Sequence, residues 1–242
     1  MHRGLPSIVV LLTSLTISST PAFCQSLKPG QSPSPVRVGL ASKRNTPILR
    51  TLAIGAVLTL AARSNDHRVQ EEAVDAPILE MGGVDLGDAY GNGFHLVAAS
   101  IGTWGIGHLT DDVYTKETAG LLIKSLLLEG AIVYGAKNVF RRSRPDNADH
   151  LSFPSGHTAG AFTFSTVLAR RHGWAIGAVA YSLATLTAAA RLEDNRHFLS
   201  DVVAGATVGI AVGQFMTRGK TRADRKAYLY ADANGLGIGL SF

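Results

Sequence analysis

The sequence predicts an all-α protein, a bundle of antiparallel helices followed by a short C-terminal β-hairpin. Three observations support this class. Apolar runs of helical length recur between residues 47 and 217 and are separated by short polar segments. Residues 227–242 instead alternate apolar and small residues, which is the period of a strand. With 242 residues, of which 46% are hydrophobic, the chain can bury a full core in one domain.

The N-terminal segment has the layout of a secretory signal peptide. Residues 1–24 contain a short basic start, an apolar run and small residues up to Cys24. A retained N-terminal anchor is the alternative. Residues 25–46 hold three prolines and several serines without a packing period, which is typical of a flexible linker. We therefore expect an exported protein whose helical domain covers residues 47–226. Cys24 is the one cysteine, which excludes an intrachain disulfide and a cysteine-based metal site.

The domain is predicted to begin with a helix from Pro47 to about Arg63, because Thr46 can cap it and proline suits the first helical position. A second, charged helix follows and is expected to end near Gly82-Gly83. The glycine-rich segment 82–93 is predicted to be a loop. Further helices are expected at 94–109, 115–140, 158–169, 174–190 and 202–217.

Two features near the C-terminus predict packing. Gly205, Gly209 and Gly213 recur at four-residue spacing, which places a face of small residues against a neighbouring helix. Asn234-Gly235 is a hairpin turn signal within 227–242. A single hairpin cannot close a membrane barrel. We expect it to pack on the helical domain.

The net charge of +5 is concentrated in three basic clusters, at 141–144, 170–171 and 218–226. Such clusters suit a phosphorylated substrate or an anionic membrane surface. The sequence carries no nucleic-acid-binding motif, so we expect no nucleic-acid partner.

The sequence gives conflicting signals about membrane insertion. Apolar runs near 16 residues are slightly short of the ~20 that cross the hydrocarbon core. After an exported N-terminus, three spans at 47–63, 94–109 and 118–136 would put Lys137 inside the cell. The basic pair 170–171, one span later, would then be outside, although basic residues favour the inside. We therefore expect a periplasmic or cell-envelope protein, soluble or membrane-associated, with an integral membrane protein as the alternative.

The segment from residue 137 to residue 201 gathers the groups that a phosphate dianion requires. Arginine and lysine balance its charge, and arginine offers two parallel donors. Backbone amides at a helix start add further donors. Two histidines can divide the roles of nucleophile and proton donor. The candidate residues are Lys137, Arg144, Ser155, Gly156, His157, Arg191, His197 and Asp201.

These residues fall into three blocks: K-x6-R-P from Lys137, P-S-G-H ending at His157, and R-x5-H-x3-D from Arg191. In this order they resemble the type 2 phosphatidic acid phosphatase (PAP2) superfamily, which includes bacterial class A acid phosphatases and vanadium haloperoxidases. The resemblance covers about residues 120–217. The chain departs from the pattern at Ala190, where the family usually has serine. This removes one hydrogen bond to phosphate, worth ~1 kcal/mol.

The resemblance implies a metal-independent phosphatase that works through a phosphohistidine. His197 would attack phosphorus, and Asp201, one helical turn later, would fix the tautomer of its ring. His157 would protonate the leaving alcohol and then activate water. The phosphate oxygens would be held by the other five candidates, Lys137, Arg144, Ser155, Gly156 and Arg191. No cofactor or metal is expected, because the three cations supply the positive charge.

The expected function is hydrolysis of a lipid phosphate, a small phosphomonoester or a pyrophosphate. One alternative is a vanadate-dependent haloperoxidase with the same anion cage, which the short chain without extra domains disfavours. Another is a non-enzymatic envelope protein that docks through its C-terminal strand, which leaves the spacing of cations and histidines unexplained. The residues that hold the leaving group are expected in the region 47–120, which carries no motif.

Overall fold

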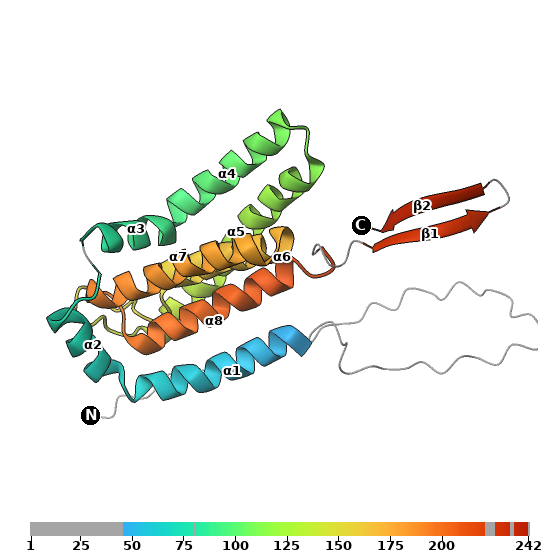
Figure 1. Cartoon of the computed structure of the whole chain (residues 1–242). Helices are drawn as coiled ribbons and strands as arrows, with labels where there is room; N and C mark the ends of the chain where they lie inside the picture. Colours follow the sequence, from blue (N-terminus) through green and yellow to red (C-terminus); the bar gives the residue numbers. More distant parts are fainter. Residues whose placement is uncertain (1–45, 80, 221–225, 233–234, 242) are drawn as a thin grey trace, which may run out of the picture. The chain divides into compact units, whose positions relative to one another are not determined.

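The computed structural model describes residues 46–79, 81–220, 226–232 and 235–241. Up to residue 216 this part of the chain is helical, which confirms the predicted helical class (Figure 1). The predicted signal peptide and the predicted linker up to residue 45 lie outside the described residues. The helices are α1 (Thr46–Arg63), α2 (Asp66–Asp75), α3 (Met81–Gly91), α4 (Gly93–Leu109), α5 (Val113–Phe140), α6 (Gly156–His172), α7 (Trp174–Glu193) and α8 (Leu199–Met216).

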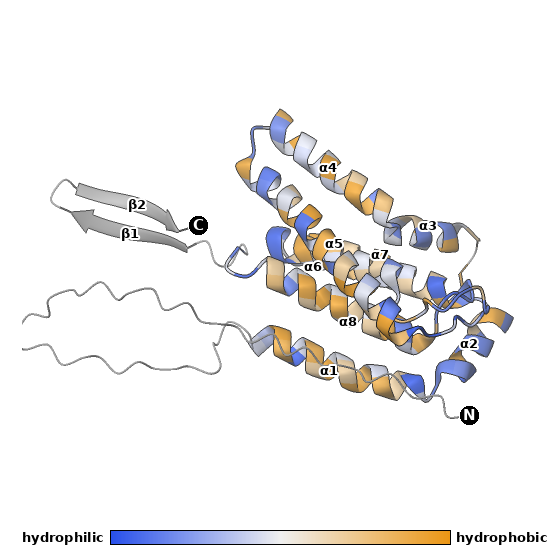
Figure 2. Cartoon of the chain, turned by 180° about the vertical axis from the view of Figure 1, so that it is seen from behind, coloured by the Kyte–Doolittle hydropathy of each residue, from blue (hydrophilic) through white to orange (hydrophobic). Residues whose placement is uncertain are grey.

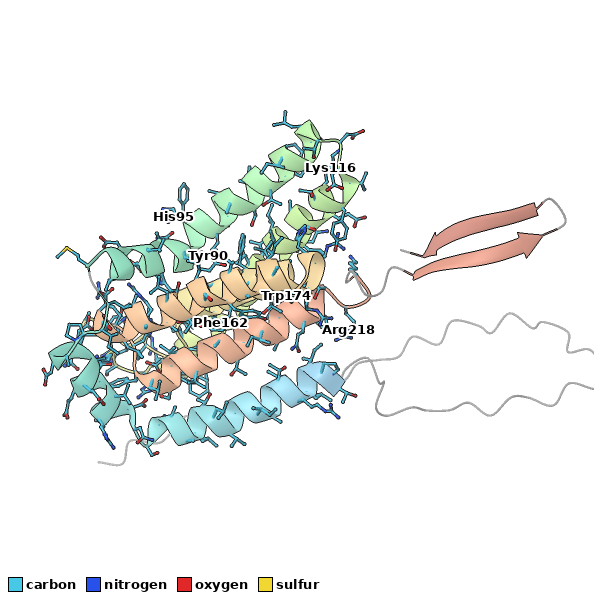
Figure 3. The ribbon with its side chains drawn as sticks, in the orientation of Figure 1. Tyr90, His95, Lys116, Phe162, Trp174 and Arg218 are labelled. Atoms are coloured by element: carbon cyan, nitrogen blue, oxygen red, sulfur yellow. The ribbon has the colours of Figure 1, made fainter. Side chains whose placement is uncertain are left out.

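Helix α6 is the central element of the bundle, and it packs against α7, α8 and α5. Tyr90 of α3 meets Phe164 edge to face, and its hydroxyl lies 3.0 Å from Ser165 Oγ (Figure 3). Both contacts hold α3 on α6. The buried apolar core is formed by Leu96, Leu121, Leu122, Leu126, Phe164 and Val167.

The predicted small-residue face of α8 is confirmed, since all three of its glycines contact α6. A methyl group on Gly205 would lie 2.5 Å from the carbonyl oxygen of Ser155. One on Gly213 would lie 2.5 Å from Cβ of Thr166, and one on Gly209 would overlap the carbonyl of Ala159. These clashes explain the spacing, because only glycine allows α8 to approach this closely.

The predicted loop at 82–93 is wrong, since α3 occupies most of it. A methyl group on Gly87 would meet Ala190 and Leu186, and one on Gly91 would meet Thr187 and His157. The glycines therefore allow close packing of a helix, and the packing outweighs their low helix propensity. The charged helix α2 ends at Asp75, earlier than predicted, because Pro77 disfavours helical geometry in the residue before it.

The C-terminal end of α5 and the N-terminal ends of α6 and α8 meet at one end of the bundle, which we call the site end. Helix α1 runs antiparallel along α8. Thr51 Oγ1 near its start lies 3.1 Å from Gln214 Oε1, and Asp66, just after its end, bonds to Ser200. Residue 46 is therefore at the opposite end. We call this the basic end, after its cations Lys116, Arg170, Arg171, Arg218 and Lys220, of which Lys116 and Arg218 are labelled in Figure 3.

Four of the described helices are long and apolar enough to cross a membrane, namely α1, α5, α7 and α8. Helix α5 has 28 residues and α7 has 20, so the expectation of runs too short to span is wrong for these helices. Only 11% of α1 is buried within the structure. Figure 2 shows apolar residues along the length of α1, whereas α2 is polar.

After the helices, β1 (Lys226–Asp232) pairs antiparallel with β2 (Gly235–Ser241). Lys226 lies opposite Ser241, and Asp232 lies opposite Gly235. The turn residues 233–234 are outside the described residues. Packing of this hairpin on the helices stays a prediction.

Candidate active site

A cavity of about 410 Å³ opens at the site end. It lies between the C-terminal ends of α5 and α7, the N-terminal end of α6 and the loops after α5 and α7. Six of the eight candidate residues line it, together with Asp149 and Arg196. The three sequence blocks therefore meet in space. The six are Lys137, Arg144, Gly156, His157, Arg191 and His197.

The other two candidates lie behind the cavity wall. Ser155 is fully buried, and its hydroxyl lies 3.0 Å from Thr158 Oγ1. A contact between Ser155 and phosphate stays a prediction. Asp201 is also fully buried and lies beside His197.

The arginines of the cavity are each held by carboxylates. Arg144 donates from Nε to Asp149 Oδ1 at 2.8 Å. Arg191 is paired with Asp88 at 2.6 Å and with Asp194. Its Nε makes no hydrogen bond among the described residues. One guanidinium N–H of Arg191 is therefore unused, while carboxylates hold other donors of both arginines.

Lys137 is the remaining predicted cation, and its ammonium donates to the carbonyl of Leu151. This contact holds the lysine against the loop between α5 and α6. Within the described part of the chain, no three His, Cys, Asp or Glu side chains gather to hold a metal ion.

His197 presents Nε2 to the cavity. Nε2 lies 3.3 Å from an Arg144 nitrogen, and a guanidinium can only donate. Nε2 is therefore the acceptor, and the ring proton belongs on Nδ1. Burial lowers the pKa of His197 to about 4, against the opposing effect of Asp201. The ring is consequently neutral at higher pH, with a lone pair on Nε2 facing the anion site.

Asp201 lies on the Nδ1 side of His197, as predicted, but at a longer distance than a hydrogen bond. Nδ1 and Asp201 Oδ2 are 3.7 Å apart. Oδ2 instead accepts hydrogen bonds from the Ser152 hydroxyl and from the Phe198 amide. These bonds fix the carboxylate, so it can orient the imidazole only after a small shift of the ring.

Sequence reasoning missed the ion cluster that holds Asp201. Arg142 donates to Asp201 Oδ1 at 2.7 Å and to Asp66 Oδ2 at 2.7 Å. Ser200 accepts a bond from the same guanidinium and donates to Asp66. Arg142 could have been noticed, since it lies inside the first sequence block. Asp66 carries no such signal.

His157 also has an acidic neighbour that the sequence did not indicate. Its Nε2 lies 3.5 Å from Asp88 Oδ1, on α3. Burial and the charge of Arg191 lower the pKa of His157 below 6.5, while Asp88 raises it. Asp88 thus favours the protonated ring that a proton donor needs. It was missed because it falls in the segment predicted to be a loop.

These shifts predict a bell-shaped dependence of log kcat/KM on pH, since kcat/KM reports the groups of the free protein. Activity should fall below about pH 4 as His197 is protonated, and fall again as His157 loses its proton on the alkaline side. Asp88→Asn removes a charge that raises the pKa of His157, so the alkaline limb should move to lower pH. The acid limb should stay in place. Asp85→Asn, an exposed change on the same helix, is the control. An unmoved alkaline limb in Asp88→Asn would contradict this role.

The comparisons with known proteins agree with this geometry. Residues 118–225 match the family model of the PAP2 superfamily. Over 107 residues the chain is 41% identical to a lipid A 1-phosphatase of Porphyromonas gingivalis. That match covers 41% of this chain and 24% of the relative's length. The matched family region ends before β1, so it lends no support to the hairpin.

Two solved structures have a similar fold. LpxE of Aquifex aeolicus is 28% identical, with a TM-score of 0.53 over 62% of this chain and 93% of that one. A transmembrane PAP2 type phosphatidylglycerolphosphate phosphatase of Bacillus subtilis is 19% identical. Its TM-score is 0.54 over 73% of this chain and 95% of that one. The motif order and the converging residues agree with the match of residues 118–225 to the PAP2 superfamily.

Proposed function

We propose that the chain is a phosphatase that hydrolyses lipid phosphate esters through a phosphohistidine. The observation that carries this proposal is the cavity that gathers His197, a second histidine and four cations, with Nε2 of His197 beside Arg144. The matched relatives are named as lipid phosphatases, which supports the substrate class.

Phosphate binding is expected to exchange ion pairs within the cavity. The anion replaces Asp149 and Asp88 as a partner of Arg144 and Arg191, and it also meets the free Nε of Arg191. Lys137 contributes the third charge. Since the charge grows on the equatorial oxygens in the transition state, these donors stabilise it without reorganising at that moment.

The reaction then proceeds in two balanced steps. Nε2 of His197 forms a bond to phosphorus while the bond to the leaving oxygen breaks, and His157 gives that oxygen a proton. In the second step His157 removes a proton from water, and the water oxygen displaces His197 from phosphorus. Inorganic phosphate leaves, and His157 regains its proton.

The leaving group has room beside the site. A second cavity of about 360 Å³ lies between α4, α5 and α6. It shares Gly156 and His157 with the phosphate cavity, and Leu96, Leu126 and Val133 give it apolar walls. An acyl chain suits such walls better than a small polar alcohol does. The region 47–120 contributes Gly93, Leu96 and Val97 of α4 to this cavity.

Phosphate release by the purified protein in detergent tests both parts of the proposal. The wild type should hydrolyse p-nitrophenyl phosphate and a long-chain phosphatidate. Gly130 lines the second cavity and has open space around its α-carbon, so Gly130→Phe should lower kcat/KM for phosphatidate by roughly tenfold and spare the small substrate. Gly135→Phe, on the same helix but away from this cavity, is the control. Absence of phosphate release from both substrates would overturn the proposal.

We further propose that the protein is embedded in the cytoplasmic membrane with its site end outside. The four apolar helices support embedding. This orientation places the basic residues 170–171 and 218–220 on the cytoplasmic side and the cations that line the cavity outside. A cysteine placed at position 147, in the site-end loop, should react with an impermeant reagent in intact cells. One placed at 219 should react only after permeabilisation, and the reverse pattern would refute this orientation.

A further inference from the structure

Glu129 is a buried carboxyl group that the reaction above does not use. It lies in the middle of α5 with only 6% of its surface exposed. It makes no hydrogen bond and no ion pair with the residues that the structure describes, although the charge of Lys137, two turns along α5, acts on it. Buried polar groups usually have a partner, because losing water without gaining a bond costs free energy. The missing partner therefore calls for an explanation.

The carboxyl group faces the apolar cavity that we assign to the leaving group. Glu129 is among its lining residues. A methyl group on Gly160 would lie 3.8 Å from Glu129 Oε2 and 3.1 Å from Leu96 Cδ1. Next to Glu129 the wall at Gly160 is thus bare, closely packed backbone, and the space for a ligand is the cavity itself. Five of the lining residues are glycines, namely Gly91, Gly93, Gly130, Gly156 and Gly160.

The distance from Glu129 to the reacting atoms follows from two helices. On α5, Glu129, Val133 and Lys137 recur every four residues and so share one face. On α6, Gly160 follows His157 by three residues, which is about 4.5 Å along the helix. His157 lines both cavities and is the donor to the leaving oxygen. Glu129 therefore lies about one helical turn beyond that oxygen.

We propose that Glu129 determines substrate specificity by accepting a hydrogen bond from the leaving group, within a few bonds of the phosphoester oxygen. The donor is a hydroxyl or an amide N–H on an otherwise apolar alcohol. This inference rests on the proposed phosphatase function. It explains both the buried carboxyl and the apolar walls, since a plain alkyl chain would leave Glu129 without a partner and a fully polar alcohol would not suit the rest of the cavity.

Three synthetic lipid phosphates test the inference and separate the two donors. They share a three-carbon backbone, one acyl chain and a terminal phosphate, and they differ only at carbon 2, which carries a hydroxyl, an acetamido group or hydrogen. The wild type should prefer one of the two donor-bearing compounds over the deoxy compound by at least about tenfold in kcat/KM. The preferred compound identifies the donor.

Glu129→Leu should abolish this preference and leave kcat/KM for the deoxy compound within about twofold of the wild type. Glu129→Gln keeps an acceptor oxygen, so it should retain most of the preference.

Hydrolysis of p-nitrophenyl phosphate reports on the chemistry and should change little in either variant. A preference that persists in Glu129→Leu, or an equal loss on every substrate, would show a merely structural role. A wild type active on the deoxy compound without any preference overturns this inference alone. A wild type inactive on every compound overturns the phosphatase function as well.

Discussion

Replacing His197 by alanine is expected to lower kcat for phosphate release at least about 1,000-fold, which is typical for loss of a covalent nucleophile. The measurement is turnover of p-nitrophenyl phosphate by purified protein. Far-ultraviolet circular dichroism checks that the helices still form. Added imidazole should restore part of the activity, since the variant has space at the position of the missing ring.

The matched control for this change is His150→Ala. His150 is an exposed histidine in the loop between α5 and α6, and it lies outside the cavity. Its removal should leave turnover within about twofold. If His197→Ala folds and retains turnover like the wild type, the nucleophile has been assigned to the wrong residue.

Arg142→Met is expected to have the largest effect on stability. The change leaves the carboxylates of Asp66 and Asp201 without their cation, and both are almost fully buried. Breaking a buried ion pair in this way costs about 3–5 kcal/mol. For a domain of this size that corresponds to a fall in Tm of roughly 10 °C, which thermal unfolding in detergent would measure. Turnover should fall as well, because Asp201 then loses its fixed position beside His197.

Arg141→Met provides the comparison, because it makes the same change at the neighbouring residue. Arg141 is exposed, so the Tm of the Arg141→Met variant should stay close to that of the wild type. Equal Tm values for the two variants would mean that the buried cluster contributes nothing to stability. Restoration of the Tm by adding Asp66→Asn to Arg142→Met would instead show that the unpaired carboxylate is the cause.

The sequence predicted most of the cavity because each block carries its residues within a short distance along the chain. Lys137 and Arg144 flank the end of α5, and Arg191 and His197 flank the end of α7. A recurring order of such blocks can be recognised before the fold is known. The helices after residue 93 were found for a similar reason, since their apolar runs are long and clearly bounded.

The parts that were missed depend on contacts between segments far apart in the sequence. Asp88 and Asp66 acquire their roles only when α3 and α2 pack against α7 and α8. The glycines of α3 predict a loop by propensity, and only the close approach to Ala190 explains them. That approach also leaves little room at position 190, which is fully buried against Gly87. Packing therefore requires a small residue at position 190.

The antiparallel course of α1 along α8 limits how the chain can be threaded through a membrane. Because α1 begins at the basic end and finishes at the site end, a single crossing by α1 puts residue 46 and His197 in different compartments. A cleaved signal that delivered residue 25 to the periplasm would leave the phosphate cavity in the cytoplasm. With the cavity outside, the start of α1 at residue 46 lies on the cytoplasmic side. Whether the chain crosses the membrane before residue 46 therefore decides which leaflet of the bilayer supplies the substrate.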